Sequence, residues 1–179
     1  MNDVISEILF SKEQIAQAVK TMGKQITEDY KGKKPLLVGI LKGSITFMAD
    51  LMREIDLDCE IDFMVAQSYG NNAVSSGVVQ IKKDLETDIE GRDVILIEDI
   101  LDSARTLNSV IHTLKARNPA SVKICTLLDK KVQRAVDIKA DYKCFDIENQ
   151  FVVGYGLDYA QSYRCLPYIG ILKREVYEK

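Results

Sequence analysis

The feature that most constrains the fold is an apolar run that leads into acids and then into a helical pattern. Val94–Ile97 are consecutive large aliphatic residues, which is typical of a strand buried on both faces of a parallel sheet. Glu98, Asp99 and Asp102 follow directly. Apolar residues recur at helical spacing from Leu107, so the segment predicts a strand, a short polar loop and a helix start. Such a junction binds phosphate, and the nearby carboxylates suit a metal ion or sugar hydroxyls, so we expect a phosphorylated sugar here.

Composition and charge narrow the class of protein. The chain has 179 residues, 46% of them hydrophobic and 28% charged, which predicts one globular domain over residues 1–179. A net charge of -3 argues against broad nucleic-acid or membrane binding. No apolar run approaches the roughly 18 residues of a membrane span, and the N-terminus lacks a signal-peptide pattern, so we expect a cytoplasmic protein. The cysteines show no C-x-x-C spacing and only His112 could join them, which favours reduced thiols over a zinc site.

Strand and helix patterns alternate along the chain. We expect strands over residues 35–41, 58–69, 78–83, 94–97, 121–128, 151–155 and 168–172. Ser11 and Gln14 have capping-box spacing and start the first helix, Ser44 is a candidate N-cap of the second, and a third follows the acidic loop. The segment between 128 and 151 is interpreted as a polar, partly helical connection. This alternation predicts an α/β fold with a mainly parallel twisted sheet flanked by helices on both faces.

Three further loops carry groups that suit ligands. Lys42 follows a buried strand, where it either faces an anionic ligand or is a solvated turn lysine. Residues 68–77 are polar, glycine-bearing and aperiodic, which indicates either a disordered segment or a lid over a site. Residues 156–164 combine carboxylate, amide, hydroxyl and guanidinium groups. The sequence therefore places several polar loops near the ends of strands.

Five segments, taken in order, resemble the hypoxanthine-guanine phosphoribosyltransferase family. They are Leu41–Gly43, Ser68–Gly70, Glu98–Ser103, Asp129–Lys131, and Phe151–Tyr159 with Arg164. The resemblance covers nearly the whole chain and implies the type I phosphoribosyltransferase fold, with a small hood formed by chain-terminal segments. It implies transfer of the 5-phosphoribosyl group of phosphoribosyl pyrophosphate (PRPP) to hypoxanthine or guanine, giving IMP or GMP and pyrophosphate. It also implies a Mg²⁺ requirement and a homodimer or homotetramer.

The same resemblance assigns roles around the acidic loop. The loop that binds the 5'-phosphate matches Asp102, Ser103, Ala104, Arg105 and Thr106. Glu98 and Asp99 match the acidic pair that holds the ribose hydroxyls and supports the metal. Asp102 also matches the general base at purine N7. An aspartate is a weak base at neutral pH, so we expect its contribution to come mainly from position.

Pyrophosphate binding is implied for two separate segments. Lys42 and Gly43 match the pyrophosphate loop, in which the family often carries a non-proline cis peptide before the lysine. Arg164 matches the second pyrophosphate-binding residue, and its planar fork suits phosphate oxygens. Ser68 and Tyr69 match the flexible loop that closes over the reaction and excludes water.

Purine binding is implied for the last third of the chain. Lys130 matches the donor to the purine 6-oxo group, and a cationic donor there favours 6-oxopurines over adenine. Phe151 matches the aromatic ring that stacks on the purine, and Val152 supplies backbone hydrogen bonds to its edge. Asp158 matches a residue near both the purine and the second magnesium.

Ala104 departs from the family pattern, which usually has glycine at this position. Glycine permits positive φ and close approach to phosphate. We therefore predict that Ala104 has an ordinary negative φ, or that PRPP binding is weakened. Two alternatives remain: a nucleotide-sensing regulator that binds RNA or DNA, and a phosphoribosyltransferase for xanthine, orotate or adenine.

Overall fold

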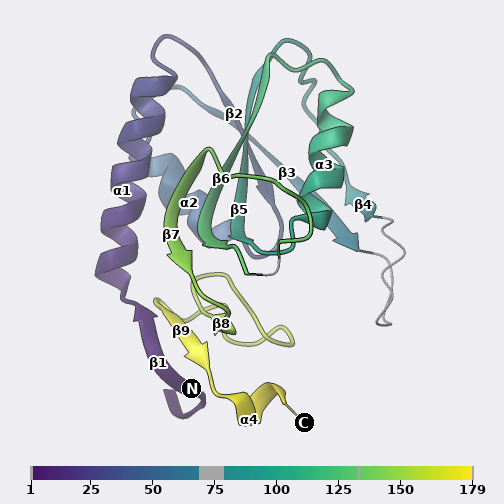
Figure 1. The fold of residues 1–179 in the computed structure, drawn as a ribbon. Coiled ribbons are helices and arrows are strands. Elements are labelled where there is room, and N and C mark those ends of the chain that lie inside the picture. The colour runs from purple at the N-terminus through teal and green to yellow at the C-terminus, as the bar shows by residue number, and fades with distance from the viewer. Residues whose placement is uncertain (1, 69–78, 133, 179) are drawn as a thin grey trace.

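The structure is a computed structural model that describes residues 2–68, 79–132 and 134–178 (Figure 1). Its elements fall into a six-stranded sheet, a three-stranded sheet and the helices around them. In chain order they are η1 (Asn2–Val4), β1 (Ile5–Phe10), α1 (Lys12–Asp29), β2 (Leu36–Ile40), α2 (Ile45–Glu54), β3 (Glu60–Ser68), β4 (Val79–Lys83), β5 (Asp93–Leu101), α3 (Arg105–Lys115), β6 (Ser121–Lys130), β7 (Tyr142–Ile147), β8 (Val152–Val153), β9 (Ile169–Leu172) and α4 (Arg174–Tyr177).

The large sheet confirms the predicted mainly parallel architecture. Its strand order is β4-β3-β2-β5-β6-β7, and only β4 runs antiparallel to its neighbour. β5, which contains the apolar run, pairs in parallel with β2 on one side and with β6 on the other. The carboxyl ends of β2, β5 and β6 therefore open at the same edge, and the polar loops after them meet there.

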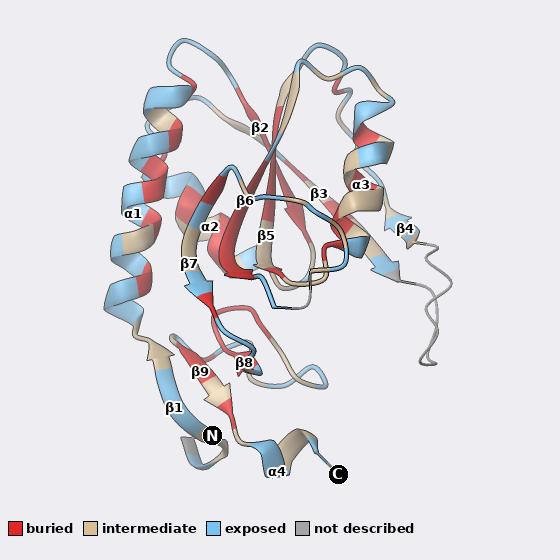
Figure 2. Cartoon of the chain, in the orientation of Figure 1, coloured by how far each residue is buried: buried red, intermediate tan, exposed pale blue. Residues whose placement is uncertain are grey.

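Helices cover both faces of this sheet, which explains the unbroken apolar run (Figure 2). Ile95 and Ile97 pack in one cluster with residues of α1 and α2, whereas Val94 and Leu96 pack in a second cluster with residues of α3. All four side chains are fully buried. Burial of such a side chain contributes about 1.5–3 kcal/mol, so β5 is a rigid base for the acids that follow it.

The two predicted helix caps have different outcomes. The capping box of α1 is confirmed, because the Ser11 hydroxyl accepts from the Gln14 amide at 3.3 Å and the Gln14 side chain accepts from the Ser11 amide at 2.8 Å. Ser44 does occupy the N-cap position of α2, as predicted, but its side chain makes no capping hydrogen bond. Its backbone is already helical and its buried hydroxyl donates to the Ile40 carbonyl at 2.6 Å. Ser44 instead ties the start of α2 to the end of β2.

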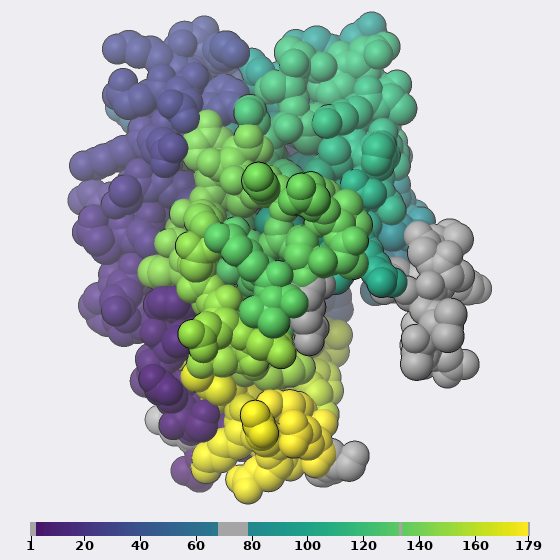
Figure 3. All heavy atoms as spheres, viewed as in Figure 1, coloured from purple at the N-terminus to yellow at the C-terminus, as the bar shows by residue number. Residues whose placement is uncertain are grey.

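The three-stranded antiparallel sheet β1-β9-β8 forms the predicted hood from the two ends of the chain. Figure 1 shows it at the end of the large sheet toward which the β7 arrow points, and Figure 3 shows the first and last segments of the chain side by side there. The strand predicted over 151–155 is shorter than expected. Gly154, Tyr155 and Gly156 have positive φ values of 100°, 51° and 104°, so the chain turns after Val153.

The sequence prediction missed β1 and β7. The connection predicted between 128 and 151 contains β7, an edge strand that pairs only with β6 in the described sheet. Lys143 and Asp146 are exposed on it, so its pattern does not stand out as apolar. The four cysteines are free thiols in the structure. In the described part of the chain, none of the helices combines the length and the apolar character needed to cross a membrane.

Candidate active site

The carboxyl end of β5 carries two carboxylates in a poorly solvated position. The strand continues to Leu101, so Glu98 and Asp99 lie within it rather than in the predicted loop. The pKa of Glu98 is raised well above its ordinary value, mainly by burial and to a lesser extent by the charge of Asp99. Burial also raises the pKa of Asp99 to about 6, against the opposite effect of the Ile100 amide. Within the described residues, Glu98 Oε2 is buried and has no hydrogen-bond partner, so this end of the strand is suited to bind an external donor or a cation.

The loop between β5 and α3 has the geometry of an anion site. α3 begins at Arg105, and the first amides of a helix have no partners within the helix. A cavity of about 120 Å³ lies here, lined in part by Glu98, Asp102, Ser103 and Thr106. The loop therefore offers amides and hydroxyls to a phosphate, as the resemblance implies.

Ala104 corrects the first of the two predictions made for it. Its φ is 63° and its ψ is 3°, so the predicted negative φ is wrong. The chain turns here from β5 into α3 through the left-handed region, which costs a residue with a Cβ atom about 1–2 kcal/mol. The methyl group is only 6% exposed and packs in the α3 cluster, which offsets part of that cost. The second prediction, weakened PRPP binding, remains open.

Three chain segments meet around Gly43 with no room for a side chain. A Cβ atom on Gly43 would lie 1.6 Å from Asp99 Oδ2, and one on Gly156 would lie 2.2 Å from the Gly43 carbonyl oxygen. The peptide bond between Leu41 and Lys42 is cis, which confirms the expectation from the family. A cavity of about 400 Å³ opens beside this contact, lined in part by Leu41, Gly43, Gln67, Glu98, Asp99 and Thr106. It shares Glu98 and Thr106 with the smaller cavity, so the two adjoin.

The two predicted pyrophosphate-binding cations lie close together. Lys42 Nζ donates to Gln161 Oε1 at 3.4 Å, and an Arg164 nitrogen donates to the same oxygen at 3.3 Å. Arg164 also pairs with Asp158 at 2.6 Å and donates to the Gly156 carbonyl at 2.6 Å. The second Asp158 oxygen accepts from the Gln161 amide at 2.8 Å. Asp158 is thus brought to the pyrophosphate residues, and Gln161, which sequence reasoning missed, bridges them.

The predicted purine lysine lies beside the predicted base. Lys130 ends β6, is 9% exposed, and its Nζ lies 3.6 Å from Asp102 Oδ2. The other Asp102 oxygen is buried and has no partner among the described residues. A cationic donor and an acceptor are therefore presented side by side, next to the anion loop.

Sequence reasoning also missed the contacts behind this pair. Arg134 donates to the carbonyl oxygens of Leu101 and Asp102 at 3.1 and 2.9 Å, and it pairs with the buried carboxylate of Asp129. The Ala135 amide donates to the Ser103 carbonyl at 3.0 Å. The connection after β6 is thereby fastened to the anion loop.

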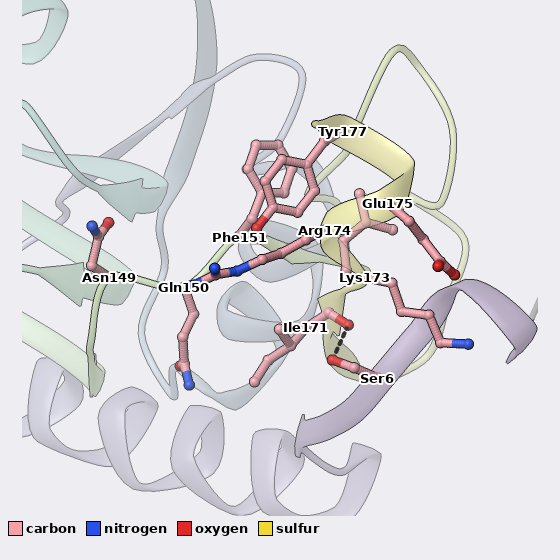
Figure 4. Close-up of a pocket in the computed structure, with 10 residues that line it drawn as sticks. Ser6, Asn149, Gln150, Phe151, Ile171, Lys173, Arg174, Glu175 and Tyr177 are labelled. Carbon is pink, nitrogen blue, oxygen red and sulfur yellow. Dashed lines mark hydrogen bonds between the residues drawn. The ribbon is translucent and has the colours of Figure 1, made fainter. Parts of the chain in front are cut away.

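The predicted stacking residue Phe151 lies on the hood rather than in the core. It is 38% exposed, and its ring stacks on Tyr177 of α4, with centroids 4.7 Å apart (Figure 4). The Tyr159 ring meets it edge-on at 5.6 Å. Val152 of β8 is buried and pairs with Ile171 of β9. Ser68 ends β3, Arg105 is exposed at the start of α3, and Tyr69 lies outside the described residues.

A magnesium ion fits this site only together with substrate oxygens. Over residues 2–68, 79–132 and 134–178, no three or more His, Cys, Asp or Glu side chains are grouped to hold a metal. Mg²⁺ usually keeps several waters and takes one or two carboxylates plus phosphate oxygens. The partnerless oxygen of Glu98 and the neighbouring Asp99 suit that mode of binding.

Comparison with known proteins agrees with this fold. Residues 6–160 match the phosphoribosyl transferase domain family. A hypoxanthine-guanine phosphoribosyltransferase of Streptococcus thermophilus is 56% identical over 98% of this chain and 97% of its own, and one of Streptococcus pneumoniae is 56% identical over 97% and 96%. The crystal structure of a hypoxanthine phosphoribosyltransferase from Staphylococcus aureus superposes with a TM-score of 0.97 at 49% identity, covering 100% of this chain and 97% of that one.

The fold and the strand-end loops thus define a type I phosphoribosyltransferase. More particularly, the chain belongs to the hypoxanthine-guanine phosphoribosyltransferase family. The resemblance inferred from five segments is confirmed.

Proposed function

We propose that this enzyme acts in purine salvage, transferring the 5-phosphoribosyl group of PRPP to N9 of hypoxanthine or guanine. The products are IMP or GMP and pyrophosphate. The observation that carries the proposal is the pairing of Lys130 Nζ with the Asp102 carboxylate at 3.6 Å, next to the anion loop. O6 and N7 of a 6-oxopurine are neighbouring atoms on one edge of the base. A donor and an acceptor placed side by side match that edge.

In the proposed reaction, Lys130 donates to O6 and Asp102 accepts the N7 proton while N9 attacks C1' of the ribose. The bond from C1' to pyrophosphate breaks, and positive charge develops on the ribose. The loop Asp102–Thr106 holds the 5'-phosphate through amides and hydroxyls. Because both ends of the substrate are fixed, the reacting atoms are held in line, which accounts for much of the expected rate enhancement.

Pyrophosphate departs with negative charge that Lys42 and Arg164 are placed to stabilise. These cations share Gln161 Oε1 as a partner, so they already face a common point. Magnesium, held by Asp99 with Glu98 or Asp158 and by substrate oxygens, would neutralise charge on the leaving group. We expect the segment that matches the family's flexible loop, Ser68 and Tyr69, to close over the reaction, as the resemblance implies. We also expect a homodimer or homotetramer, as the family resemblance implies.

The proposal is tested by pyrophosphate release with PRPP, Mg²⁺ and each of hypoxanthine, guanine, xanthine, adenine and orotate. We expect turnover with hypoxanthine or guanine and little with adenine, because the adenine 6-amino group presents hydrogens to Lys130. Absence of turnover with both hypoxanthine and guanine would refute the proposal.

An Asp102→Asn variant tests the assigned base. We expect kcat to fall by about 10²–10⁴-fold, since amide oxygen does not accept the proton. The matched control is Asp56→Asn, on an exposed loop after α2. Full activity in Asp102→Asn would remove Asp102 from the reaction.

A further inference from the structure

We propose that Arg134 is a positioning residue that holds the PRPP loop and the purine lysine in register with each other. The inference rests on the proposed function, since it gives Lys130 and Asp102 their roles. Arg134 does not lie in the described cavities at the anion loop. Its effect is exerted through the backbone of residues that do.

The contacts of Arg134 join two strand ends that both lead into the site. Its Nε donates to the Asp102 carbonyl at 2.9 Å, and Nη2 donates to the Leu101 carbonyl at 3.1 Å. The same Nη2 pairs with Asp129 Oδ1 and lies 3.4 Å from the Lys130 carbonyl. One planar group thus contacts the last residue of β5, the residue after it and the last two residues of β6.

The contacts are those of a buried and specific ion pair rather than of a surface arginine. The side chains of Arg134 and Asp129 are 14% and 6% exposed. The remaining donor, Nη1, bonds the Ile138 carbonyl, so the guanidinium also closes the connection after β6 on itself. A charge buried in this way is kept only with good partners, because loss of one partner leaves the other uncompensated.

Only arginine among the side chains can make this set of bonds. Its fork holds donors at fixed angles in one plane, whereas a lysine offers a single point of charge. Lysine at 134 would retain the pairing with Asp129 but lose contact with the carbonyls of Leu101 and Asp102. The Asp102 carboxylate and the Lys130 ammonium would then no longer be held at their present spacing.

The primary test is Arg134→Lys, assayed with PRPP and hypoxanthine. We expect kcat/KM for hypoxanthine to fall on the order of 10- to 100-fold, because small displacements of positioned groups are costly. The matched control is Arg117→Lys, whose guanidinium pairs with Asp84 at 2.6 Å on the surface beyond α3. Kinetic constants of Arg134→Lys within twofold of wild type would overturn the inference, whatever its melting temperature.

A double-mutant cycle separates positioning from general destabilisation. If Arg134 acts by fixing the spacing between Asp102 and Lys130, Arg134→Lys should cost much less in a Lys130→Met background than in the wild type. If the fold-losses in kcat/KM of the two single variants multiply in the double variant, the inference is overturned.

If Arg134→Lys does not fold, Asp129→Asn replaces it. We expect a loss of about threefold or more in kcat/KM for hypoxanthine, and the absence of a loss would count against the inference. Wild-type inactivity with 6-oxopurines refutes the proposed function, whereas an active wild type with an unaltered variant refutes only this inference.

Discussion

The site is built from two halves that differ in whether their polar side-chain atoms have hydrogen-bond partners. At the strand ends, Glu98 and Asp102 each keep a buried oxygen without a partner in the described structure. In the hood loop, Asp158 and Arg164 pair with each other at 2.6 Å, and Gln161 takes up the remaining donors. The strand-end half is preformed and incomplete, whereas the hood half is satisfied internally. Substrate must therefore complete the first half and displace partners in the second.

This difference predicts different behaviour on substitution. A buried carboxylate oxygen without a partner destabilises the protein and is retained for function. Exchangeable pairs in the hood contribute little to stability, because partly exposed ion pairs are weak. Changes at the strand ends should alter rate and stability, and changes in the hood should alter the binding and departure of pyrophosphate with little effect on stability.

After Asp102→Asn, the largest effect is expected for Lys130→Met, at the strand-end half. It removes a buried cation that would donate to the purine oxygen, so kcat/KM for hypoxanthine should fall by about 100-fold or more. Discrimination against adenine should fall with it. The control is the neighbouring Lys131→Met, whose side chain is 67% exposed and pairs with Asp146. Equal losses in both variants would contradict the assignment.

Asp99→Asn should separate stability from activity. Burial raises the pKa of Asp99 from its ordinary value of 3.8 to about 6. Between pH 3.8 and pH 6, the folded state therefore binds more protons than the unfolded chain. Stability is therefore lost as pH rises through this window. We expect the variant to gain about 1–2 kcal/mol at pH 8 and nothing near pH 4, measured by urea unfolding, while activity falls.

The control for Asp99→Asn has the opposite sign. Asp84 pairs with Arg117, which lowers the pKa of Asp84 below its ordinary value. Its stabilisation is present at neutral pH and lost as pH falls, so Asp84→Asn should destabilise the protein slightly at pH 8. A loss of stability in Asp99→Asn at pH 8 would show that the charged carboxylate is stabilised by partners in the folded state.

In the hood half, Gln161→Glu should raise the KM for PRPP by about fivefold. The new carboxylate would pair with Lys42 and Arg164, now 3.4 and 3.3 Å from the amide oxygen, and pyrophosphate would have to displace it. The KM for hypoxanthine should stay constant, and added salt should reduce the difference. Gln17→Glu on the exposed side of α1 is the control. An unchanged KM for PRPP would mean that Gln161 does not compete with substrate.

The smallest effect is expected for Ala104→Gly. Glycine adopts φ 63° without cost but loses a buried methyl group, so stability should be nearly unchanged. Closer approach of the backbone should lower the KM for PRPP by about twofold. An unchanged or higher KM would show that alanine does not weaken PRPP binding. Ala116→Gly, where φ is -65°, should instead only destabilise.

Much of this comparison was predictable from the sequence. The run Val94–Ile97 alone indicated a central buried strand, and the polar groups after it indicated an anion loop at its carboxyl end. The capping box at Ser11 was predicted from spacing that involves only neighbouring residues. These features depend on local patterns, which the sequence displays directly.

The rest depends on partners that are distant along the chain. Arg134 bonds carbonyls more than thirty residues earlier, and carbonyls leave no trace in side-chain pattern. The stack of Tyr177 on Phe151 requires the C-terminal helix to fold back onto the hood. The positive φ of Ala104 was missed because alanine rarely adopts it, so the fold overrides local preference there.

The contact among Gly43, Asp99 and Gly156 also has an evolutionary consequence. A side chain at 43 would overlap a carboxylate, and one at 156 would overlap the main chain of 43. In a selection from a random library, a variant at 43 could recover only if residue 99 became smaller, and it would then lose its acid. Position 156 has no such escape, because the obstacle is backbone and its φ is 104°. We expect positions 43 and 99 to vary only together, and position 156 not to vary.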